Sequence, residues 1–168
     1  MWCVMKCLPG EAQKVMESCK ANLSRQALQD VFMFTCERMK RYQGSWHLET
    51  RQMFPDCLFL ETEDPEQLAR ELEPYRAYAC AGGKREMLQS VPPEAEDFLR
   101  RLCGDAHHLP MSSGYIRDGI THVSSGPLVG MERRIRKIDR HKRLADIAAP
   151  LHGMEAPVQA GLEIISKS

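Results

Sequence analysis

The sequence predicts a mixed α+β protein built from two modules. Short apolar runs alternate with amphipathic helical segments in the first part of the chain, and Gly, Asp, His, Pro and Ser cluster at residues 104–114. Residues 1–111 carry 14 Lys/Arg against 17 Asp/Glu, whereas residues 112–168 carry 9 against 6. A change in net charge between halves is typical of modules with different partners.

The first module should begin with a buried strand that ends before Pro9-Gly10. Ala12, Val15, Met16 and Cys19 then recur at helical spacing, and Asp64-Pro65 is typical of an N-cap followed by proline in the first helical turn. We expect strands at 2–7, 31–35, 46–53 and 57–60, a polar loop or hairpin tip at 37–44, and helices at 12–19, 65–73 and 92–102. This order predicts a sandwich of the split βαβ kind.

The second module has less regular patterning. Residues 120–123 and 161–166 are expected strands, and residues 126–130 an expected tight turn. Between them, Met131, Ile135, Ile138 and Ala145 fit one helical stripe, while the glycines around them fit short strands joined by turns. Periodicity alone favours a helix here.

Several classes of function have no support in the sequence. The seven cysteines are an odd number without a CxxC pair, so we expect buried free thiols and no metal site. Neither a signal peptide nor an apolar run of about 20 residues occurs, which predicts a cytoplasmic protein without a membrane partner. Gly82-Gly83-Lys84 lacks the rest of a phosphate-binding loop and is an expected turn. Without a catalytic constellation, we expect neither an enzyme nor a cofactor.

A dense run of positive charge is the clearest candidate for binding. Residues 131–143 hold seven basic side chains against Glu132 and Asp139, and these are Arg133, Arg134, Arg136, Lys137, Arg140, Lys142 and Arg143. On a strand, Arg134, Arg136 and Arg140 would share a face. The run could be a sheet edge whose charge prevents pairing with other strands. We favour RNA as the partner, because basic side chains supply the phosphate contacts that dominate nucleic-acid affinity. Arg38, Lys40 and Arg41 at the expected hairpin tip are the next candidates.

Two segments resemble the NusG family of transcription factors. Trp2-Cys3-Val4, the Pro9-Gly10-Glu11 turn and the segment Phe54-Pro55-Asp56-Cys57-Leu58-Phe59-Leu60 resemble the NGN domain, with Asp56 and Cys57 in place of a glycine and a tyrosine. Residues 119–148 are similar to the KOW motif through Val123, Gly126-Pro127-Leu128, Gly130 and Ile138-Asp139. Residues 137–143 and 161–164 resemble the LoaP type of paralogue.

The resemblance implies an NGN domain of ferredoxin-like split βαβ fold at 1–103, a linker at 104–114 and a KOW domain at 115–168. It also implies that residues 112–168 form an SH3-like β-barrel in which residues 132–139 are a strand, against the helix that periodicity favours. In the family this second domain can also switch fold.

The same resemblance implies a non-enzymatic, monomeric processive antiterminator. The NGN domain would grip the clamp helices in the largest subunit of bacterial RNA polymerase, through Phe54, Pro55, Cys57, Phe59 and Lys6. We expect Leu58 and Leu60 to fill the core instead. Basic residues would bind RNA, for example a structured hairpin, and the KOW domain could contact Rho or the NusE ribosomal protein. The alternative is a KOW-containing, ribosome-associated RNA-binding protein without a polymerase role.

Overall fold

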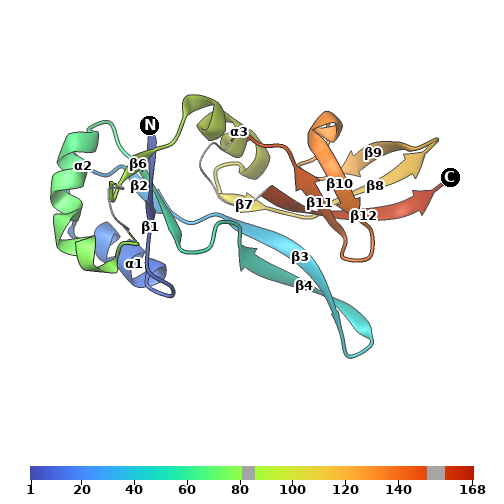
Figure 1. The fold of residues 1–168 in the computed structure, drawn as a ribbon, viewed down its shortest axis with the longest axis horizontal. Coiled ribbons are helices and arrows are strands. Elements are labelled where there is room, and N and C mark those ends of the chain that lie inside the picture. The colour runs from blue at the N-terminus through green and yellow to red at the C-terminus, as the bar shows by residue number, and fades with distance from the viewer. Residues whose placement is uncertain (81–85, 151–157) are drawn as a thin grey trace. The chain divides into compact units, whose positions relative to one another are not determined.

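The computed structural model describes residues 1–80, 86–150 and 158–168, and these form a mixed α+β fold (Figure 1). Two compact units divide the chain: unit 1 is Met1–Met33 with Phe54–Glu96, and unit 2 is Phe34–Met53 with Asp97–Ser168. Residues 34–53 and 97–103, assigned from sequence to the first module, therefore cluster with the C-terminal residues. The division of the chain at 104–114 into separately folding modules stays a prediction. The turn expected at Gly82-Gly83 lies outside the described residues.

Unit 1 contains a four-stranded antiparallel sheet in the order β2-β5-β1-β6. Its strands are β1 (Trp2–Lys6), β2 (Asp30–Phe32), β5 (Cys57–Glu61) and β6 (Gln89–Ser90). The register places Trp2 opposite Glu61 and Lys6 opposite Cys57. The strands expected at 2–7 and 57–60 are confirmed, because continuous apolar runs of this length are typical of central strands.

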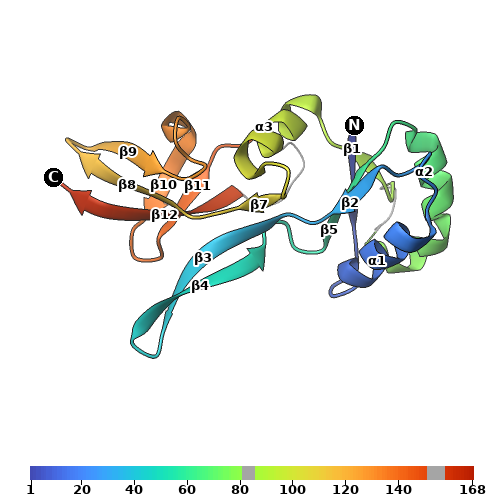
Figure 2. The same ribbon diagram turned by 180° about the vertical axis from the view of Figure 1, so that it is seen from behind.

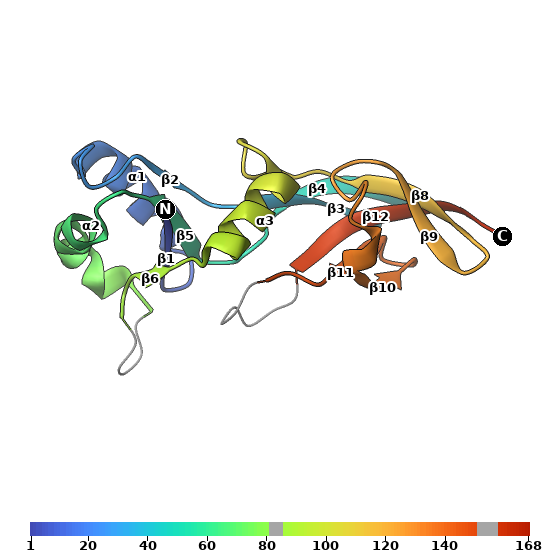
Figure 3. The same ribbon diagram turned by 90° about the horizontal axis from the view of Figure 1, so that it is seen from above.

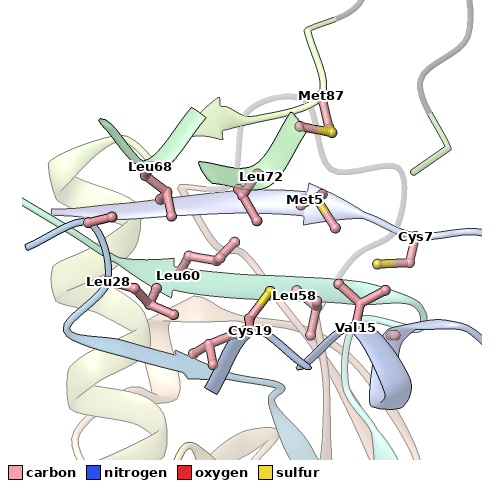
Figure 4. Close-up of a cluster of buried hydrophobic side chains, with 13 residues drawn as sticks. Met5, Cys7, Val15, Cys19, Leu28, Leu58, Leu60, Leu68, Leu72 and Met87 are labelled. Atoms are coloured by element: carbon pink, nitrogen blue, oxygen red, sulfur yellow. The ribbon is translucent and has the colours of Figure 1, made fainter. Parts of the chain in front are cut away.

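Helices α1 (Ala12–Asn22) and α2 (Pro65–Leu72) cover one face of this sheet, followed by a 3₁₀ helix, η1 (Glu73–Tyr78). Figures 1 and 2 show both α-helices on the same side of β1. The Asp64 carboxylate accepts a hydrogen bond from the Gln67 backbone N–H at 3.0 Å, which confirms the expected N-cap. Buried side chains from sheet and helices meet in one cluster, among them Met5, Leu58, Leu60, Val15, Cys19, Leu68 and Leu72 (Figure 4).

The polar segment expected as a loop or hairpin tip belongs to a long hairpin in unit 2. Strands β3 (Thr35–Tyr42) and β4 (Ser45–Gln52) pair along their full length, and β7 (His108–Leu109) joins β3 in parallel. Only Gln43 and Gly44 form the turn, with φ of 51° and 78°, as a two-residue hairpin of primed type requires. The hairpin tip expected within residues 37–44 and the strand expected at 46–53 are confirmed, but residues 37–42 belong to β3 and not to the tip. This part of β3 is polar and largely solvated, so it lacks the apolar alternation that indicates a strand.

The C-terminal residues form a five-stranded sheet in the order β10-β11-β12-β8-β9, with β12 and β8 parallel. Its strands are β8 (Ser112–Arg117), β9 (Ile120–Ser125), β10 (Ile135–Asp139), β11 (Leu144–Ile147) and β12 (Val158–Lys167). The strands expected at 120–123 and 161–166 are confirmed. The helix favoured by periodicity is wrong: Glu132–Arg134 is the short 3₁₀ helix η2, and the strand begins at Ile135. The expected linker at 104–114 contains β7 and the start of β8.

The remaining helix, α3 (Pro93–Cys103), begins within one residue of its predicted start. Among the described residues, no helix combines the length and apolar character that a bilayer crossing requires.

A glycine allows the hairpin and the C-terminal sheet of unit 2 to approach closely. A Cβ atom at Gly161 in β12 would lie 3.0 Å from the Glu37 carbonyl oxygen in β3 and would collide with the Met111 sulfur. Figure 3 shows β12 passing alongside β3. Because glycine has no side chain, β12 can approach β3 this closely at Gly161.

Candidate nucleic-acid interface

Of the two aromatic residues expected as polymerase contacts, Phe59 is buried in unit 1. Phe59 has no exposed surface and packs against two other rings, with centroid distances of 5.9 Å to Phe32 and 6.3 Å to Trp2. The half-buried ring of Phe54 lies 5.7 Å from Phe59. The expectation that Phe59 contacts a partner at the surface was wrong, because this strand places apolar side chains on both of its covered faces.

The two turns that carry the NGN resemblance meet at one edge of unit 1. The Gly10 N–H donates to the Asp56 carboxylate at 3.2 Å, and the Cys7 N–H donates to the Asp56 carbonyl at 2.7 Å. Asp56 has φ of 62°, a left-handed conformation that glycine adopts without cost and aspartate tolerates. Lys6 and Pro55 are exposed at this edge.

Two exposed apolar side chains lie next to the same edge. Leu8 is 40% exposed and Tyr78 is 43% exposed, and the Leu8 N–H donates to the Tyr78 carbonyl at 2.8 Å. We call the surface formed by Lys6, Leu8, Pro55 and Tyr78 the edge patch. Cys57 beside it is half-buried, and burial raises the pKa of its thiol, an effect that Lys6 opposes and Asp56 reinforces. The raised pKa favours the neutral thiol at Cys57.

In unit 2, two groups of basic residues that are remote in sequence line one groove. The hairpin contributes one wall and the turn between β10 and β11 the other. Figures 1 and 2 show this turn beside the β3–β4 hairpin. The basic residues that line it are Arg38, Lys40, Arg41, Arg51, Lys137, Arg140, Lys142 and Arg143. Acidic residues in the lining are Asp139, Asp146 and Glu163, so the lining carries a clear excess of positive charge. We call it the cationic groove.

An arginine from one wall stacks on a tryptophan from the other. The Arg143 guanidinium lies 4.1 Å from the centroid of the half-buried Trp46 ring, and its Nη1 lies 3.2 Å from a Glu163 carboxylate oxygen. A cation over an indole face is the most favourable arrangement of this type. The turn between β10 and β11 is therefore tied to strand β4.

A second connection joins β3 to the C-terminal sheet. The Arg38 guanidinium donates to the Gln159 side-chain oxygen at 3.0 Å, and the Gln159 amide donates to the Asp146 carboxylate at 3.1 Å. All three side chains are partly buried, and such connected hydrogen bonds hold their groups in fixed geometry. Arg38 and Arg143 thus hold the walls of the groove together.

The other predicted cations of the groove are exposed and available to a ligand. Lys40, Arg41, Lys137, Arg140 and Lys142 make no ion pair with any residue that the structure describes. Arg51, by contrast, lies 3.1 Å from Glu49. Unpaired cations facing a groove are suited to an anion that enters from solvent.

Three residues of the predicted basic run lie elsewhere in unit 2. Arg133, Arg134 and Arg136 are exposed but line neither part of the cationic groove. Arg134 instead covers the Phe98 ring at 5.0 Å and donates to the Ala148 carbonyl at 3.2 Å. The expected shared face of Arg134, Arg136 and Arg140 is wrong, because η2 and a bulge after Ile135 interrupt the strand alternation.

Among the groove residues that sequence reasoning missed are Trp46, Arg51 and His141. Trp46 had a usable signal, since an indole two positions after a glycine turn is unusual on a polar strand. His141 and Arg51 had no such signal, because the local sequence does not indicate which basic residues come together in the folded chain.

His108 and Glu37 in unit 2 form a small polar cluster that connects neighbouring segments. His108 Nδ1 lies 2.7 Å from the Thr35 hydroxyl and its Nε2 lies 3.7 Å from the Glu37 carboxylate, which also accepts from the Met111 N–H at 2.9 Å. These contacts fasten β7 and the following residues to β3. No group of three His, Cys, Asp or Glu side chains within residues 1–80, 86–150 and 158–168 is arranged to hold a metal ion.

No protein-family model matches this chain, and no curated protein sequence is significantly similar to it. The cationic groove and the edge patch therefore carry the argument about function.

Proposed function

We propose that this chain is a NusG-type transcription elongation factor that acts as a processive antiterminator. Unit 1 would bind RNA polymerase through the edge patch, and the cationic groove of unit 2 would bind RNA. In this proposal the NGN-like residues supply unit 1 and the hairpin, and the C-terminal five-stranded sheet is the KOW domain. Holding the polymerase clamp closed would make pausing and termination less favourable.

The observation that carries the proposal is the meeting of the two NGN-like turns. Residues 9–11 and 54–57, which carry the resemblance in sequence, are joined by a hydrogen bond from the Gly10 N–H to the Asp56 carboxylate. Asp56 stands where the family has a glycine, and its φ is positive, a conformation that glycine adopts readily. The aspartate therefore adopts a conformation that a glycine at this position would also accept.

The cationic groove supports the RNA contact. Its five unpaired cations can each meet a phosphate, and phosphate contacts supply most of the affinity in nucleic-acid binding. The groove lies within one compact unit and therefore depends on no arrangement between units.

The proposal is tested by binding to purified core RNA polymerase and by transcription through an intrinsic terminator. Wild-type protein should co-elute with polymerase and increase read-through. The variant Lys6→Glu with Pro55→Asp adds negative charge at the edge patch and should weaken co-elution at least tenfold, as loss of an interface anchor does.

A matched control places the same changes on an exposed part of α1. Lys14→Glu with Ala21→Asp makes one charge reversal and adds one acid at exposed positions, and it should bind polymerase as the wild type does. Absence of wild-type co-elution, together with sedimentation on ribosomes, would replace the proposal by the ribosome-associated alternative.

A further inference from the structure

We infer that the cationic groove binds an unpaired nucleic-acid strand and not a duplex. The inference rests on the proposed RNA contact of this groove and names the class of strand that fits it. The strand would pass between Lys40 and Arg41 on the hairpin and Lys137, Arg140 and Lys142 on the turn between β10 and β11.

The shape of the groove favours a single strand. It is a hollow between two walls: its part on the hairpin side has a volume of about 560 Å³, and its part on the side of the turn between β10 and β11 about 860 Å³. Hollows of about 300–1,000 Å³ hold ligands of drug-like size, which corresponds to a short stretch of a strand. A duplex presents its phosphates on a convex surface and is bound across its grooves, so it would rest on the rims and leave the lining cations unmatched.

The walls are held at a fixed separation before any ligand arrives. Arg143 joins Trp46 to Glu163, and the chain of Arg38, Gln159 and Asp146 joins β3 to β11 and β12. Arg38 and Arg143 each bind side chains across the groove, while the five exposed cations make no ion pair within the part of the chain that the structure describes. A preformed site loses less conformational freedom on binding, which favours a flexible ligand such as a single strand.

An aromatic platform stands next to the groove on the hairpin. The Tyr42 and His47 rings stack with centroids 3.7 Å apart and an interplanar angle of 12°, and Tyr42 is 41% exposed. Tyr42 lies on the same strand face as Lys40, which lines the groove, so a strand held at Lys40 can place a base against this pair. Basic grooves combined with exposed rings are the usual means of binding unpaired strands, because bases that are not paired can stack on protein.

This recognition chemistry is shared by RNA and single-stranded DNA. Phosphate contacts and stacking do not distinguish the two sugars, whereas a contact to the 2′-hydroxyl does. The experiment therefore includes both strands. Fluorescence anisotropy of the full chain would be measured with an unstructured RNA of about 12 nucleotides, the same sequence as DNA, and a blunt RNA duplex of equal length, at several salt concentrations.

We expect the single-stranded RNA to bind at least tenfold more tightly than the duplex. With about four phosphates contacted, log affinity should fall with log salt at a slope near −3, from ~0.7 per phosphate. Lys137→Ser with Lys142→Ser should flatten the slope by about 1.4. Tyr42→Ala should weaken binding about tenfold without changing the slope, because stacking releases no counterions.

The matched control is Arg133→Ser with Arg136→Ser, which removes the same charge from the same segment outside the groove. It should leave slope and affinity near those of the wild type. Equal loss in both double variants, or a duplex that binds as tightly as the single strand, would overturn the inference. Equal RNA and DNA affinities support recognition by phosphate and stacking alone, and an RNA preference adds a 2′-hydroxyl contact. Polymerase co-elution measured in parallel separates this result from the proposed function, because the groove variants leave the edge patch intact.

Discussion

Two segments were expected to contact partners: residues 54–59 in unit 1 and residues 133–143 in unit 2. They differ in how much of each is exposed in the structure. In the first, the aromatic ring of Phe59 is fully buried, and Lys6 and Pro55 remain as surface residues. In the second, most charges stay exposed, but only Lys137, Arg140, Lys142 and Arg143 line the groove. Apolar residues on a strand are drawn into the core, whereas charged residues remain outside and are sorted by tertiary neighbours.

Phe59→Asp should produce the largest effect and tests the buried side of this comparison. A carboxylate placed among the Trp2, Phe32 and Phe54 rings has no partner, and the cavity adds to its cost, so the free energy of unfolding should fall by about 4 kcal/mol or more. Urea denaturation measures this, with Phe59→Leu as a milder control. If the Phe59→Asp variant were as stable as the wild type but no longer bound polymerase, the burial of Phe59 would be contradicted.

Gly161→Val tests whether close approach of hairpin and sheet holds the groove in unit 2. The added side chain would collide with Met111 and crowd the Glu37 carbonyl, so unfolding should become easier by about 1–3 kcal/mol. Denaturation and the fluorescence of Trp46 would both report it. Gly161→Ala should show a smaller shift in the same direction, and no effect from either variant would contradict the close contact.

Asp64→Ala probes unit 1 at a site remote from its aromatic cluster. Loss of the N-cap hydrogen bond to the Gln67 N–H should reduce the stability of α2 by about 1 kcal/mol. Asp64→Asn retains an acceptor and is the control. Thermal unfolding is the measurement, and equal melting temperatures for wild type and Asp64→Ala would argue against the cap.

Glu71→Gln should have the smallest effect and one that depends on pH. Hydrogen bonds from the Ser24 N–H and hydroxyl, at 2.8 and 2.7 Å, lower the pKa of Glu71 in the folded state. A lowered pKa stabilises the fold above the unfolded value, near 4.3, and that contribution is lost as pH falls through the folded pKa. The variant should therefore be slightly less stable at pH 7 and match the wild type in acid, as denaturation at both pH values would show.

The sequence predicted those parts of the fold whose signals are local. The apolar runs of β1 and β5, the helical stripe of α1 and the Asp64-Pro65 cap of α2 each act over a few residues, and the structure confirms them. Residues 37–42 were missed because an exposed hairpin is stabilised by its partner strand and not by a buried face.

The candidate groove was predictable only in pieces. Arg38, Lys40 and Arg41 were identified separately from Lys137, Lys142 and Arg143, and nothing in either segment indicates that they meet. Their meeting depends on non-local packing, above all on Gly161 and on the stacking of Arg143 with Trp46. Such contacts join residues about a hundred positions apart, beyond the reach of periodicity.

The turn at Gln43-Gly44 limits how this hairpin can change over evolution. Side chains on a strand alternate between faces, so one inserted residue in the turn would reverse the facing of every side chain on β4. Trp46 would then point away from Arg143, even though no residue had been substituted. The residue types in the turn should accordingly vary more among homologues than its length. Any homologue whose turn differs in length should differ by an even number of residues.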